Sequence, residues 1–128
     1  MGSIGNWWVK GFGIRPGEEV RRGFYVNYLR ADQRPLGGKL YVTNQRVLFC
    51  PHLIDSFFGG SPRMILLKKI VNVAVVDPTE VPDREIVGGG TEKRLRIDTS
   101  ANQSEYFIIN DLEAAVSTIN DELESFEA

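Results

Sequence analysis

The sequence predicts a mainly β protein of one domain, in which about seven antiparallel strands form a small barrel or sandwich capped by a C-terminal amphipathic α-helix. Short segments with alternating polarity run from residue 18 to residue 109 and are separated by Gly-, Pro- and Asn-containing turns. From residue 110 the apolar spacing changes to steps of three and four, as in a helix. A length of 128 residues fits a single domain.

The first strand is expected within residues 18–30. Its apolar residues share one parity and should face the core: Val20, Phe24, Val26 and Tyr28. The domain core is expected at about residues 17–126, with residues 1–16 as an N-terminal extension.

Residues 37–49, GGKLYVTNQRVLF, carry the pattern of a two-stranded hairpin. Gly37-Gly38 is expected to break the chain before the first arm, on which Leu40 and Val42 would face inward. Asn44 is expected at the turn, since Asn tolerates the left-handed conformation of tight hairpins. The second arm is almost entirely apolar and should be buried, with Cys50 as an inert thiol in a reducing compartment.

Four further strands are expected at residues 63–68, 69–76, 94–98 and 105–109. In the third of these the alternation places Leu95 and Ile97 inward, whereas the inward parity of the last strand is ambiguous.

The helix follows the last strand, and Asn110 or Asp111 can cap it. Its apolar residues lie on one face: Leu112, Ala115, Val116, Ile119, Leu123 and Phe126. Because a small barrel has an open end, a helix with one apolar face can cover that end. Seven strands and a capping helix are the architecture of the pleckstrin-homology-like (PH-like) fold.

Residues 38–49 resemble the G-x-L-Y-[LV]-T-[ND]-x-R-[LV]-x-F core of GRAM domains, and Pro51-His52 is similar to bacterial single-domain members of that family. Residues 65–73 resemble the family's I-P-L-x-x-I-x-x-V segment, although Leu66 stands where proline is usual. The resemblance covers about residues 17–126 and implies a PH-like fold. It also implies binding of phosphoinositides, other anionic phospholipids or proteins.

Charge is distributed unevenly along the chain. Residues 1–50 carry eight Lys/Arg and three Asp/Glu, whereas residues 111–128 carry six acidic residues and no basic ones. A basic body is compatible with an anionic partner, and also with ordinary solvated charge. The residues expected to bind phosphate or a lipid headgroup lie on or between the first three strands: Arg21, Arg22, Arg30, Arg34, Lys39 and Arg46.

A second hypothesis is a protein-interaction or self-association module without lipid binding. Large apolar residues in the predicted loop at residues 52–62 and near the N-terminus would supply the contact surface: Trp7, Trp8, Leu53, Ile54, Phe57 and Phe58. The loop could insert into a membrane interface, contact a partner or fold back on the barrel.

Other classes find little support in the sequence. His52, Asp55 and Ser56 offer triad residue types but no triad spacing, so we expect no enzyme. One His and one Cys do not suffice for a structural zinc site, and no other cofactor is indicated. A pI near 5.4 argues against nucleic acid. No apolar run is long enough for a transmembrane segment, so we expect a cytoplasmic protein that acts alone or at the periphery of a membrane.

Overall fold

The computed structural model describes residues 13, 15–29, 35–51, 63–77 and 93–127. Within these ranges seven strands are followed by a C-terminal helix, which confirms the predicted fold class. In chain order the elements are β1 (Val20–Leu29), β2 (Leu36–Thr43), β3 (Arg46–Pro51), β4 (Arg63–Leu66), the 3-10 turn η1 (Leu67–Lys69), β5 (Ile70–Val76), β6 (Arg94–Thr99), β7 (Ser104–Ile109) and α3 (Leu112–Glu127).

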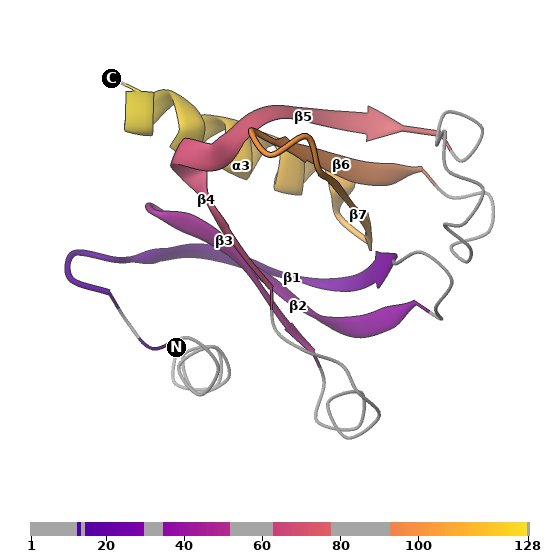
Figure 1. The fold of residues 1–128 in the computed structure, drawn as a ribbon. Helices are drawn as coiled ribbons and strands as arrows, with labels where there is room; N and C mark the ends of the chain where they lie inside the picture. The colour runs from indigo at the N-terminus through magenta and orange to yellow at the C-terminus, as the bar shows by residue number, and fades with distance from the viewer. Residues whose placement is uncertain (1–12, 14, 30–34, 52–62, 78–92, 128) are drawn as a thin grey trace.

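The strands form one antiparallel sheet in the order β4-β3-β2-β1-β7-β6-β5. The long strand β1 joins its two halves, because it pairs with β2 from Val20 to Tyr28 and with β7 from Val26 to Leu29. The β1–β4 half and the β5–β7 half lie over one another as two layers (Figure 1). Strands β4 and β5 therefore form the two ends of the sheet.

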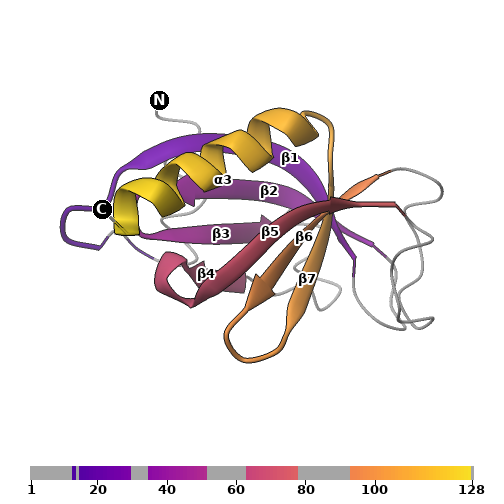
Figure 2. The same cartoon turned by 90° about the horizontal axis from the view of Figure 1, so that it is seen from above.

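The core lies between these two layers, and the helix α3 covers it from one side. The helix lies over β1 and β2 and beside β5 (Figure 2). Its apolar stripe is confirmed: Ala115 and Ile119 are fully buried in the main core, and Leu112, Val116 and Leu123 pack against it. Phe126 is the exception, since 48% of it is exposed near the end of the helix. The carbonyl of Asp111 accepts the first helical bond, from the N–H of Ala115, so Asp111 is the N-cap.

The inward parity of β1 holds for Phe24, Val26 and Tyr28 and fails for Val20. A β-bulge shifts the register with β2 between Val20 and Arg22. One extra residue moves every preceding side chain to the opposite face of the strand. Val20 therefore packs on the other side of the sheet, against the buried residues Tyr41, Leu48 and Cys50.

The expected chain break at Gly37-Gly38 is wrong, because both glycines lie inside β2. A Cβ atom on Gly38 would lie 2.4 Å from the carbonyl oxygen of Cys50 and 2.8 Å from the Phe49 ring. Gly38 is thus required by the close approach of β3 and not by a turn.

The left-handed conformation expected at Asn44 is also absent: Asn102 is the non-glycine residue with positive φ in the described part of the chain. The turn between β2 and β3 is held by the Thr43 hydroxyl, which accepts the N–H groups of Gln45 and Arg46, each at 3.0 Å. The Asn44 amide instead bonds the residues that precede β1, accepting the N–H of Glu19 at 2.8 Å. The hairpin is as predicted, and its turn chemistry is different.

Candidate functional site

Arg46, the arginine of the family-like motif, lies inside the protein and only 3% of it is exposed. Its Nε and Nη2 atoms donate to the two carboxylate oxygens of Glu18 at 2.7 and 2.9 Å, and Nη2 also donates to the Gly13 carbonyl at 2.8 Å. Thr43 donates to the same carboxylate at 2.8 Å. Arg46 therefore fastens the segment before β1 to the β2–β3 hairpin, and we leave it out of any headgroup site.

Burial alone would raise the pKa of Glu18, but hydrogen bonds from Arg46 and Thr43 outweigh it and hold the pKa below its ordinary value. Glu18 thus stays ionised and compensates the buried guanidinium. A buried pair with this geometry serves the fold, because neither charge is accessible to a ligand.

Arg21 and Arg22 are exposed at the start of β1 and already face carboxylates. Arg21 contacts Glu122 of α3 at 3.2 Å, and Arg22 contacts Asp111 at the N-cap of α3 at 3.3 Å. These pairs connect the basic body to the acidic helix. The two arginines also lie far from the opposite end of β1, since seven residues of strand span up to about 23 Å.

Lys39, another of the predicted headgroup ligands, is partly accessible. It is half-buried on the outer face of β2, with its Nζ atom 4.7 Å from the ring centroid of Tyr25, which is 61% exposed. Arg30 and Arg34, which belong to the connection between β1 and β2, lie outside the described residues. Of the described members of the predicted basic set, Arg46 is internal, whereas Arg21, Arg22 and Lys39 reach the surface.

The predicted interaction residues cannot be placed, because all of them lie outside the described part of the chain: Trp7, Trp8, Leu53, Ile54, Phe57 and Phe58. The same holds for His52, Asp55 and Ser56. Among the described residues no cluster of three His, Cys, Asp or Glu side chains could hold a metal ion. Nor does the described part contain a helix long and apolar enough to span a bilayer.

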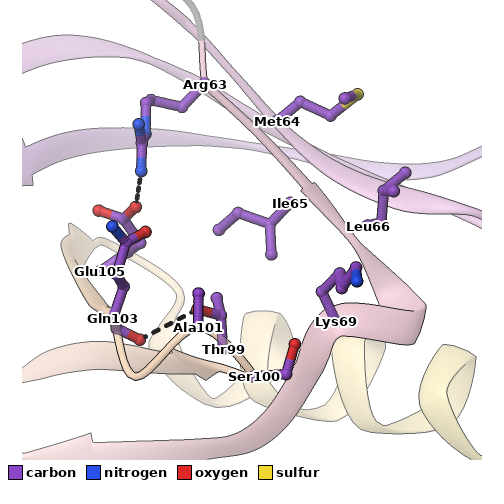
Figure 3. A pocket seen from close by; sticks show the side chains of 10 residues that line it. All are labelled: Arg63, Met64, Ile65, Leu66, Lys69, Thr99, Ser100, Ala101, Gln103 and Glu105. Carbon is purple, nitrogen blue, oxygen red and sulfur yellow. Dashed lines mark hydrogen bonds and ion pairs between the residues drawn. The ribbon is translucent and has the colours of Figure 1, made fainter.

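A groove of about 450 Å³ lies between β4 and the turn that joins β6 to β7. Ile65 projects into it from β4 and faces Thr99, Ser100 and Ala101 across the hollow (Figure 3). The turn is closed by a hydrogen bond in which the Thr99 N–H donates to the Gln103 carbonyl at 2.9 Å. The volume lies within the range of ordinary ligand sites.

Polar contacts bracket the groove at both ends. At one end Arg63 forms an ion pair with Glu105 (Figure 3). Glu105 also accepts a 2.5 Å hydrogen bond from the buried Tyr28 hydroxyl. At the other end the Ser100 N–H donates to the Lys69 carbonyl at 2.8 Å. The Lys69 side chain is exposed and forms no ion pair with a described residue. The groove thus has one neutralised end and one basic end.

Sequence reasoning missed this groove, although it anticipated one of its walls as the strand at residues 63–68. Arg63 and Glu105 are 42 positions apart, and no local pattern shows that they meet. The strand itself was expected at residues 63–68, and its end at Leu66, where η1 begins, is seen in the structure alone.

No protein-family model matches the chain, and none of the curated proteins matches it. Several solved structures are similar, and two of them are described here. The C-terminal domain of an unknown protein from Leishmania infantum aligns with a TM-score of 0.69 at 16% identity, over 94% of this chain and 97% of that one. The Vps36 N-terminal PH domain aligns with a TM-score of 0.62 at 15% identity, over 88% and 83%. At these identities the likeness shows a PH-like fold, and the GRAM resemblance stays a prediction.

Proposed function

We propose that this PH-like domain is a non-catalytic binding module whose ligand is a segment of another protein, held in the groove beside β4. The observation that carries the proposal is the groove itself, which combines an apolar floor at Ile65, a hydrogen-bonded turn as the opposite wall and a strand at the end of the sheet. A sheet edge with pockets for alternate side chains beside it is one of the recurring sites of peptide recognition.

The basic end of the groove supports a peptide with a carboxylate. Arg63 is compensated by Glu105, so Lys69 supplies the uncompensated charge among the lining residues. A short interface of this kind would be weak and transient.

Selection of a displayed random peptide library on the domain tests the proposal. Ala101→Trp would fill the groove from its exposed turn, and Ser117→Trp on the exposed side of α3 is the matched control. Selected peptides should lose at least about tenfold in affinity on Ala101→Trp and keep it on Ser117→Trp. No enrichment over bare support, or equal binding to the two variants, would count against the groove.

A second candidate function is binding of anionic lipid headgroups on the outer face of β1 and β2. Lys39 beside the exposed Tyr25 is the observation in its favour, since a cation and an aromatic ring side by side suit a membrane surface. Arg30 and Arg34 would supply further charge. Flotation with anionic and neutral vesicles at low salt tests it. We expect Lys39→Glu to reduce binding to anionic vesicles and Arg22→Glu to leave it unchanged, and equal retention on both vesicle types would exclude this function.

A further inference from the structure

Among the described strands β4 lies at one end of the sheet, and some of its backbone hydrogen-bonding groups point away from β3 toward the groove. The Leu67 N–H donates to the Gln45 carbonyl at 3.0 Å, in the same register as the Arg46–Leu66 and Val47–Ile65 pairs of β3 and β4. In an antiparallel ladder every second residue directs both its N–H and its C=O to the neighbouring strand. Ile65 and Arg63 therefore bond β3, and the backbone groups of Met64 and Leu66 point away from it.

The side chains of β4 alternate between the two faces of the sheet. Ile65 points into the protein and forms the apolar floor of the groove, while Met64 lies on the outer face, where its sulfur accepts from the Arg46 Nη1 at 3.1 Å (Figure 3). The groove thus offers two backbone donor–acceptor sets, at Met64 and Leu66, next to an apolar surface. An extended chain needs both to add as a further strand.

The antiparallel pairing of the sheet and the charge of the groove together indicate where the acidic residues of an added strand would lie. Strand β4 runs from the compensated Arg63 end toward the basic Lys69 end, and every pairing in this sheet is antiparallel. A strand antiparallel to β4 would begin beside Lys69 and end beside Arg63. Its carboxylates must then precede its alternating apolar residues.

Resting on the proposed function of the groove, we propose that the ligand is an extended protein segment that adds to β4 as an antiparallel strand, with acidic residues immediately before its apolar ones. The bond pattern limits the contact to about four residues, because β4 has four. Lys69 selects the acidic end, and Ile65 and Ala101 contact alternate apolar side chains of the ligand.

The probe is a capped octapeptide in which two glutamates precede six alternating valines and threonines. Its affinity and its effect on the backbone amide shifts of the domain are measured by NMR at low salt. We expect shifts at Met64 and Leu66, and binding about fivefold tighter than that of peptides with two glutamines in the same place or with the glutamates at the other end. Lys69→Glu should abolish this preference, and Lys93→Glu, an exposed lysine that does not line the groove, should keep it.

N-methylation of the peptide separates strand addition from other modes of groove binding. Only alternate N–H groups of an added strand face β4, so methyl groups on one set of alternate residues should abolish binding and on the other set should be tolerated. Equal sensitivity of the two sets, or no shift at Met64 and Leu66 at millimolar peptide, would overturn the inference. Library peptides that still depend on Ala101 would in that case leave the proposed function intact.

Two other occupants are outcomes of the same experiments. If Phe57→Ser with Phe58→Ser raised the affinity for the peptide, residues 52–62 of the same chain would be the occupant. If light scattering gave a dimer that Ala101→Trp dissociates, the occupant of the groove would be a second copy of this chain. Either result would contradict an external peptide ligand.

Discussion

Removal of the Glu18 charge should destabilise this domain more than removal of the exposed Arg22–Asp111 ion pair. Glu18→Gln keeps the shape of the side chain and leaves the Arg46 guanidinium buried with a neutral partner. The side chains of Glu18 and Arg46 are 0% and 4% exposed, and two of their atom pairs lie within 2.9 Å. Solvent therefore cannot replace the lost charge.

The expected loss is about 3–5 kcal/mol of the free energy of unfolding, because a buried charge without its partner pays its desolvation cost uncompensated. For a domain of this size that loss lowers the midpoint of thermal unfolding by roughly 10–20 °C. Arg22→Ala removes the contact with Asp111. The side chains of Arg22 and Asp111 are 50% and 59% exposed, so the loss should be at most about 1 kcal/mol of the free energy of unfolding.

Urea unfolding followed by far-UV circular dichroism at pH 7 measures both variants. Since the folded-state pKa of Glu18 is depressed, its stabilising effect is complete above the ordinary value of 4.5 and is lost as pH falls through the lower pKa of the folded state. The difference between wild type and Glu18→Gln should accordingly shrink in acid.

The reasoning is refuted if Glu18→Gln costs no more than Arg22→Ala at pH 7. The double variant Glu18→Leu with Arg46→Met adds a second check, because replacing both charges by apolar groups should recover much of the loss. A double variant as unstable as Glu18→Gln would show that hydrogen bonds to the backbone, and not the buried charge, dominate.

Three further outcomes follow from single buried groups. The Tyr41 hydroxyl is buried without a hydrogen-bond partner among the described residues, so Tyr41→Phe should stabilise by about 1 kcal/mol in urea unfolding, and a loss would reveal a partner elsewhere. Gly38→Ala should destabilise by about 1–3 kcal/mol in the same assay, since its methyl group would collide with β3; Ser117→Ala on α3 should be neutral, and equal effects would contradict the close approach. Burial raises the pKa of the Cys50 thiol to about 11, so a thiol reagent at pH 8 should react with it only after unfolding, and fast reaction of the native protein would be inconsistent with this placement.

Much of the fold follows from the sequence because the period of apolar residues reports which face of an element is buried. Alternation at Phe24, Val26 and Tyr28 and the three–four spacing from Leu112 to Leu123 correctly predicted strands and helix. Val20 escaped this reasoning, since a one-residue bulge inverts the parity without leaving a local signal.

The candidate binding groove and the buried ion pair depend on tertiary structure, because their residues are far apart in the chain. Arg46 and Arg63 are both arginines at the starts of strands, and the sequence singled out Arg46. Folding places Glu18, 28 positions away, against Arg46 and buries it, while it places Arg63 across a groove from Glu105, 42 positions away. By itself the sequence determined which segments form strands and helix, since that depends on neighbouring residues. Only the packed sheet decided which charge is internal and where a ligand can reach the chain, since that depends on distance in space.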